Sequence, residues 1–128
     1  MKSYIIISQD TLDFSKIVNF LAIHGDTYFS SENRLVCEGD NAWSAIEKSE
    51  HVRKEYSETE IEFIERIIPS PNFYIIEFST HFHANLYLKF IKDNGPFVID
   101  NDHGALLNYE DIIRLNQSGL DWTEYRAN

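Results

Sequence analysis

The chain has few of the residues that build the common catalytic and redox motifs: one cysteine, Cys37, five glycines and three prolines in 128 residues. One thiol cannot form an internal disulfide or a multi-cysteine zinc site, and it favours a reducing compartment, so we expect a cytoplasmic protein. The glycines never cluster, which excludes a glycine-rich phosphate-binding loop. No Gly-x-Ser-x-Gly elbow occurs, and Cys37 lies in a strand-like segment typical of an inert, small apolar residue.

Basic residues are also scarce, since 11 Lys and Arg stand against 21 Asp and Glu for a formal net charge of −10. Nucleic acids and anionic membranes bind basic surfaces, so neither is expected as a direct partner. Residues 1–48, 49–80 and 81–128 each carry seven acidic residues against three or four basic ones. This even spread excludes a disordered acidic tail and indicates a folded acidic domain that prefers basic partners.

Long apolar runs are missing as well. No stretch approaches the roughly 18 to 20 residues that cross a bilayer, so no membrane span is expected. The apolar residues 4–7 are fewer than the core of an export signal needs and end at Ser8. What the chain does contain is 43% apolar and 14% aromatic residues, the composition of one globular domain over residues 1–128.

Apolar periodicity and capping signals predict alternating strands and helices. Strands are expected at residues 3–7, 34–38, 42–47, 73–78 and 97–99, and helices at residues 11–21, 57–67, 80–90 and from about 108. Asp10 is the expected cap of the first helix, and Ser57 with Glu60 forms a capping box for the second. Trp43 and Ile46 lie an odd number of residues apart, so both can face inward only with a bulge or a partly helical segment.

This order of elements predicts the fold class. We expect an α+β protein, a single layered domain whose central sheet of about four to six strands is flanked by three or four helices. Trp122 and Tyr125 are expected to fix the C-terminal tail to this domain.

The densest polar cluster is residues 100–103, with the sequence Asp-Asn-Asp-His, directly after an apolar strand. Layered folds often carry functional groups at such a position. One hypothesis is a metal-dependent hydrolase whose divalent ion activates water. The ligands of that ion would be His81, His83, Asp100, Asp102 and His103. The other hypothesis is a polar turn, closed by Gly104, that is available for contact with a partner.

The residue spacing favours the turn. On a helix His81 and His83 point about 200 degrees apart, and they share a face only on a strand. A calcium loop needs glycine at position 105, which is Ala105, and Gly104 falls one position early. We therefore expect no metal and no other cofactor.

The C-terminal half has a distinctive order of segments. An apolar strand at residues 73–78 is followed by a helix, by the strand and turn of residues 97–104, and by a helix that begins near Tyr109. In this it resembles the small acidic immunity proteins encoded beside toxins in bacterial contact-dependent inhibition and polymorphic toxin systems. The resemblance covers about half of the chain. It implies a cytoplasmic inhibitor of one cognate toxin, in this class often a nuclease.

The charge agrees with that role. A nuclease needs a basic cleft for phosphates, and an acidic protein with exposed aromatic residues can occupy the cleft after rapid, electrostatically guided capture. We therefore expect an immunity protein that neutralises a basic toxin domain by stoichiometric protein–protein inhibition, and no enzyme. The expected partner contacts are Trp43, Asp100, Asp102, His103, Asp121 and Trp122. The metal-dependent hydrolase stays open as the alternative, and an adaptor or structural subunit is a third hypothesis.

Overall fold

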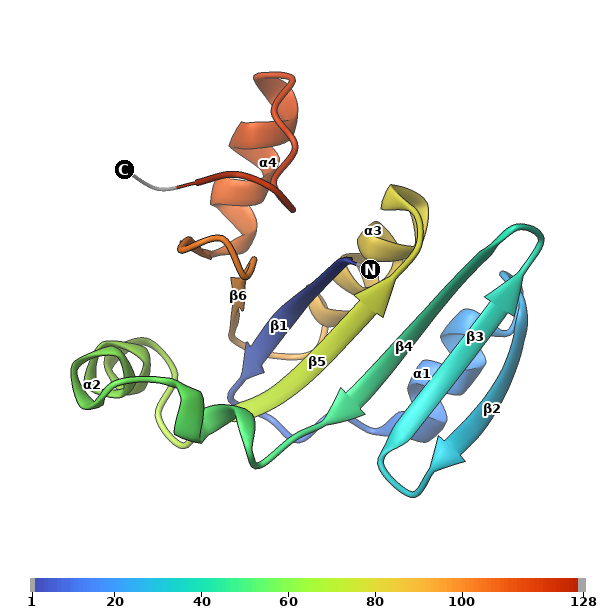
Figure 1. Cartoon of the computed structure of the whole chain (residues 1–128), viewed down its shortest axis with the longest axis horizontal. Coiled ribbons are helices and arrows are strands. Elements are labelled where there is room, and N and C mark those ends of the chain that lie inside the picture. The colour runs from blue at the N-terminus through green and yellow to red at the C-terminus, as the bar shows by residue number, and fades with distance from the viewer. Residues whose placement is uncertain (1, 127–128) are drawn as a thin grey trace.

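One antiparallel sheet of seven strands organises the computed structural model, which describes residues 2–126 (Figure 1). The strands lie in the order β2-β3-β4-β5-β1-β6-β7. Their bounds are β1 (Lys2–Ser8), β2 (Asp26–Ser31), β3 (Arg34–Gly39), β4 (Ala42–Lys48), β5 (Asn72–Phe78), β6 (Phe97–Asp100) and β7 (Leu106–Leu107). The first strand of the chain therefore lies inside the sheet, between β5 and β6.

The predicted α+β class is confirmed. The sheet has seven strands, one more than the expected maximum of six, and two of them, β2 and β7, have no counterpart among the five predicted strand ranges. β2 is exposed at nearly every position, so its sequence shows no apolar alternation, and β7 has only two residues. Edge strands of this kind show little apolar patterning in the sequence, because they pair with a neighbouring strand along one edge only and bury few side chains.

The helices begin where side chains can cap them. The described part of the chain forms α1 (Phe14–Leu21), α2 (Glu58–Ile67), α3 (His81–Ile91), α4 (Tyr109–Gln117) and the 3-10 helix η1 (Val52–Glu55). The predicted capping box of Ser57 and Glu60 is confirmed. The predicted Asp10 cap is wrong, since Asp13 caps α1; the backbone N–H of Leu12 donates to the Tyr74 hydroxyl, which holds the preceding turn out of the helix.

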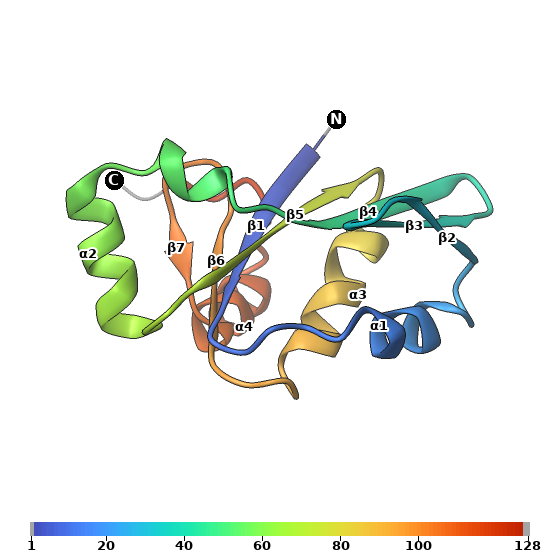
Figure 2. The ribbon, with the colours of Figure 1, turned by 90° about the horizontal axis from the view of Figure 1, so that it is seen from below.

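Helices cover the two faces of the sheet unequally. Helices α1, α3 and α4 bury the main core against one face of the sheet, and Figure 2 shows α1 and α3 below strands β3 and β4. That core includes Tyr4, Ile6, Leu35, Cys37, Ile46, Tyr74, Ile76 and Ile99 from the strands. On the other face, α2 and η1 form a smaller core, but only over β1, β5, β6 and β7. No helix of the described chain packs on that face over β2, β3 and β4.

Strand β4 is regular. Ile46 is buried on the helix-covered face opposite Leu35, whereas Trp43 pairs with Glu38 and points to the other face. The odd spacing of these two residues therefore needs neither a bulge nor a helical segment, because only one of them faces inward.

None of the helices formed by residues 2–126 has the length and hydropathy of a membrane span.

Candidate functional site

The predicted polar turn at residues 100–104 is an internally bonded structure. Asp100 accepts a hydrogen bond from the Tyr56 hydroxyl at 2.6 Å and another from the backbone N–H of Asp102. Asn101 is buried, and its amide group donates to the backbone oxygens of Trp122 and Tyr125. Asp102 has a left-handed backbone, as does Gly104. The turn therefore fixes the C-terminal tail and leaves Asp102 exposed.

The five proposed metal ligands are not gathered at one point. The Nε2 atom of His81 lies 2.8 Å from a carboxylate oxygen of Asp121, whereas Nδ1 of His83 lies 2.8 Å from the Ser44 hydroxyl. Asp100 is engaged by Tyr56. Among residues 2–126, no three His, Cys, Asp or Glu side chains form a group suited to a metal ion. The structure does not assemble the site that the hydrolase hypothesis needs.

Trp122 anchors the tail as predicted, but it is not a partner contact. Its ring is only 2% exposed, lies 5.0 Å from the ring of Tyr4, and donates its indole N–H to Asn85. A ring this buried cannot reach a second protein. The expectation of a partner contact at Trp122 is therefore wrong, because the anchoring role uses the whole side chain.

Asp121 is occupied within the fold as well. It accepts hydrogen bonds from the backbone and hydroxyl of Thr123, in addition to the contact with His81. Burial acts to raise the pKa of Asp121, but the bonds from Thr123 and the nearby His81 outweigh it and hold that pKa below its usual value. Asp121 remains charged and ties the tail to the start of α3.

A buried polar network under β4 has the residue types of a nucleophile and its base. The Ser44 hydroxyl lies 2.8 Å from His83 Nδ1 and 2.8 Å from the Tyr87 hydroxyl. All three residues are buried, and burial together with His24 lowers the pKa of His83. A substrate cannot reach these groups, so they act as hydrogen-bonded core residues. Cys37 lies opposite Ser44, and burial raises the pKa of its thiol, as expected of an inert cysteine.

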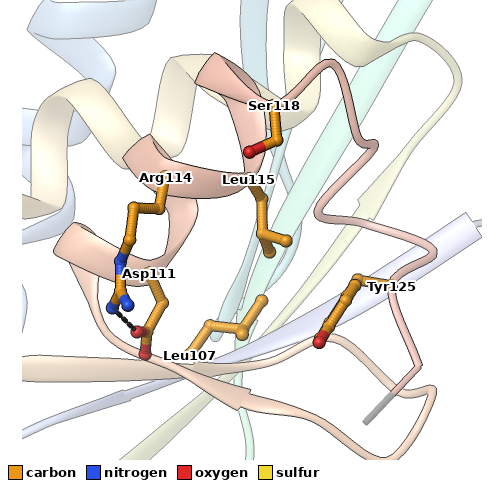
Figure 3. A pocket seen from close by; sticks show the side chains of 6 residues that line it. All are labelled: Leu107, Asp111, Arg114, Leu115, Ser118 and Tyr125. Atoms are coloured by element: carbon orange, nitrogen blue, oxygen red, sulfur yellow. Dashed lines mark hydrogen bonds and ion pairs between the residues drawn. The ribbon is translucent and has the colours of Figure 1, made fainter.

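A pocket of about 300 Å³ lies between β7, α4 and the C-terminal tail (Figure 3). Its lining consists of Leu107, Asp111, Arg114, Leu115, Ser118 and Tyr125. The two charged side chains, Asp111 and Arg114, pair with each other along α4. The pocket therefore presents apolar side chains beside a neutralised ion pair, and none of its lining residues forms a nucleophile–base pair.

The uncovered half of the sheet presents a different kind of surface. We call it the open face and define it by the outward side chains of β2 to β5: Asp26, Tyr28, Arg34, Glu38, Trp43, Glu47 and Glu77, with Asp40 in the turn that follows β3. They share one face because strand residues two apart lie on the same side and paired residues lie abreast. Two rows across the strands show this, Tyr28-Val36-Ala45-Glu77 and Asp26-Glu38-Trp43.

The long side chains of the open face shield its small ones. Val36 and Ala45 are 4% and 1% exposed although no helix packs above them. Arg34 reaches across the sheet to Glu77, 3.1 Å away, and to Glu47 at 4.0 Å. These contacts hold the Arg34 guanidinium over the small residues. The face is therefore a continuous layer of charged and aromatic side chains.

The electrostatics of the open face are strongly acidic. Its five carboxylates, those of Asp26, Glu38, Asp40, Glu47 and Glu77, share it with one guanidinium, that of Arg34. The Tyr28 hydroxyl donates to Glu38 at 2.7 Å, and this bond raises the pKa of Tyr28. At one end, His24, Gly25, Asp26, Glu38, Gly39 and Asp40 line a polar hollow of about 410 Å³.

The backbone of Trp43 is held in place by Ser79, the residue that follows β5. The Ser79 hydroxyl accepts from the Trp43 backbone N–H at 2.8 Å and donates to its oxygen at 3.2 Å. Among the predicted contacts, Trp43 alone belongs to the open face. Asp100 is on the same side of the sheet, but strands β5 and β1 separate its strand from β4. The structure therefore does not gather the predicted contacts into one patch.

The remaining residues of the open face were not predicted. β3 and β4 carry no clear alternation of polar with apolar residues, since Val36 and Ala45 face outward and Ser44 faces inward. Their shared face is recognisable only when the strand order and register are known. Comparison of the chain with protein-family models, curated proteins and solved structures found no match.

Proposed function

We propose that this protein is an immunity protein, which binds a basic toxin domain and neutralises it by stoichiometric protein–protein inhibition through the open face. One observation carries the proposal: a half-sheet without a covering helix bears five carboxylates, one guanidinium and the aromatic side chains Tyr28 and Trp43. The partial resemblance in the C-terminal half to immunity proteins of bacterial toxin systems supports the same function. The cytoplasm is the compartment in which such a protein meets its toxin.

The open face has the composition of a recognition surface. Tyr and Trp are enriched among the few residues that carry most of the binding energy at protein interfaces, where a partner desolvates them. Tyr28 is 46% exposed, and Trp43 is half-buried with a fixed backbone. The carboxylates around these two rings give the surface a preference for a basic partner.

The net charge of the chain acts at longer range. A formal charge of −10 attracts a basic toxin before contact and speeds its capture, which is the property an antidote needs. Inhibition then requires only that the acidic face cover the basic cleft in which the toxin holds its substrate. No chemical step by the immunity protein is needed.

The genes that flank this one provide the test. Each flanking product is expressed with an inducible promoter, with and without this protein, and growth, co-purification and association rate are measured. We expect one flanking product to be toxic, to be neutralised at a 1:1 ratio, and to associate about tenfold more slowly when ionic strength rises from 20 to 200 mM. If no flanking product binds this protein at low salt, the proposal is wrong.

Charge reversal locates the interface. Glu38→Lys changes an exposed carboxylate of the open face, and Glu62→Lys makes the same change on α2 at the opposite end of the molecule (Figure 1). Because contact forms at the open face, Glu38→Lys is expected to slow association about tenfold more than Glu62→Lys does. Trp43→Ala is expected to accelerate dissociation. Equal effects of the two charge reversals would place the interface elsewhere.

A further inference from the structure

The edge of the sheet beside the open face is itself an unpaired strand. Within the described chain, β2 pairs with β3 alone, so one side of its backbone has no strand partner. The opposite edge differs, because β7 has two residues and packs against α4. Residues 2–126 therefore form one long free edge, the six residues of β2.

The first four residues of β2 leave its edge open to another strand. Natural edge strands are commonly protected by lysine, proline, bulges or short length. β2 has the sequence Asp-Thr-Tyr-Phe-Ser-Ser, with neither lysine nor proline, and five of its six residues are exposed. Its one irregularity lies between Phe29 and Ser31. The four residues from Asp26 to Phe29 pair regularly with β3. Their backbone groups that point away from β3 therefore form an ordered template for another strand.

Both sides of this template carry an exposed aromatic ring. Tyr28 points to the open face and is 46% exposed, and Phe29 points to the helix-covered side and is 52% exposed. The ring of Phe29 stacks on that of Phe14 in α1, with centroids 6.1 Å apart and planes 19° apart. An added strand would find an apolar platform on one side and an acidic, aromatic surface on the other.

The charge around β2 decides which strand fits. The hollow formed with Asp26, Glu38 and Asp40 lies at the start of β2. A second copy of this chain would bring the same carboxylates and another formal charge of −10 to this edge. A basic segment would neutralise them. The surroundings of β2 therefore favour a basic partner over self-association.

We propose that β2 receives an extended segment of the basic partner as an eighth strand of the sheet. The segment carries basic side chains on the side of the open face and apolar ones on the side of Phe29. Main-chain hydrogen bonds supply affinity, and the alternating side chains supply specificity. This inference rests on the proposed function and adds the conformation and sequence pattern of the bound segment.

Two peptides separate strand addition from general attraction to an acidic protein. One is a hexapeptide of alternating lysine and valine, and the other is the same peptide with every backbone nitrogen methylated, which keeps its charge but removes its donors. Amide exchange of the whole protein is followed by NMR with each peptide. We expect the first peptide to slow several-fold the exchange of the β2 amides that point away from β3. The methylated peptide should leave that exchange unchanged.

The same measurement on the complex with the flanking gene's toxin separates the two proposals. Absence of toxin binding defeats the proposed function, whereas toxin binding without protection of β2 defeats strand addition alone. Equal effects of the two peptides on β2 also overturn strand addition. Protection of β2 that grows with protein concentration, together with a doubled mass by light scattering, would show pairing with a second copy and overturn the proposal.

A matched pair of substitutions provides an independent readout. Phe29→Lys places a charge on the apolar side of β2, and Phe63→Lys does so at an equally exposed phenylalanine of α2, since the two rings are 52% and 49% exposed. We expect Phe29→Lys to weaken toxin binding at least tenfold and Phe63→Lys to leave it within twofold. Equal losses would overturn the proposal.

Discussion

At the scale of single residues, Asp100 was predicted to contact a partner, but its carboxylate stabilises the fold itself. It ends a strand in a polar cluster, yet its carboxylate accepts the Tyr56 hydroxyl, which links the turn to the residue that follows η1. Burial and this hydrogen bond to Asp100 raise the pKa of Tyr56 far above its ordinary value, so the phenol keeps its proton. The pair joins the smaller core to the turn that fixes the tail.

Removal of the Tyr56 hydroxyl tests that link. Tyr56→Phe keeps the ring against Phe73 but deletes a hydrogen bond to a charged group. We expect a loss of about 1–2 kcal/mol in the free energy of unfolding, measured by urea denaturation. Tyr109→Phe is the control, because this tyrosine is only half-buried at the start of α4, and it should change stability by less than about 0.5 kcal/mol.

His83 predicts a pH dependence of stability. Burial, with a smaller effect of His24, lowers its pKa in the folded state below the ordinary value of 6.5. Between these two values the unfolded chain binds a proton that the folded chain does not, so stability falls as pH decreases below about 6.5. Urea denaturation at pH 7.5 and 5.5 measures the fall, and His83→Gln should reduce it. His51→Gln, an exposed histidine, should leave the fall unchanged.

At the scale of elements, α2 is attached to the sheet by a small part of its surface. Of its residues Ile64 is buried, whereas Phe63 and Ile67 are largely exposed, and the helix packs only on the smaller core. The capping box of Ser57 and Glu60 then supplies a larger share of its stability than a cap gives to a helix in the main core.

Truncation of two isoleucines on α2 tests this attachment. Ile64→Ala removes a fully buried side chain from the smaller core, and we expect it to cost about 3 kcal/mol of the free energy of unfolding. Ile67→Ala changes a residue that is 44% exposed and should cost less than about 1 kcal/mol. Similar costs for both would show that the helix buries a different face from the one described.

The elements with strong local signals were predictable, and the others depended on long-range pairing. The Ser57 capping box and the apolar strand β5 carry their information within a few residues of sequence. β2 does not, because its pairing with β3 stabilises it while its own residues remain exposed. The start of α1 was misplaced because the bond from Leu12 to Tyr74 joins residues 62 positions apart.

At the scale of the whole molecule, the excess of negative charge is spread along the sequence, and the part of it on the open face comes from several strands. Tyr28, Glu38 and Glu77 come from three strands, and only the register of β2 to β5 brings them together. The sequence therefore predicted the sign of the surface and one member, Trp43, but not its location. The turn at residues 100–103 was predicted as a partner contact because its polar residues are adjacent in sequence.

The same charge predicts opposite effects of salt on folding and on binding. Repulsion within a chain of formal charge −10 opposes the compact state, and its ion pairs lie at or near the surface, where each contributes little. We expect the thermal midpoint to rise when NaCl increases from 20 to 500 mM, while toxin association slows. Calorimetry and stopped-flow mixing measure the two quantities. A fall in the midpoint would show that attractive ion pairs outweigh the repulsion.

The central position of β1 also sets the order in which the chain can fold. Its partners, β5 and β6, begin at Asn72 and Phe97, so β1 can pair only when residues far along the chain are present. β2, β3 and β4 are consecutive antiparallel strands joined by short turns, and their pairings close short loops. We therefore expect the acidic strands of the open face to pair early, and β1 to join the sheet later.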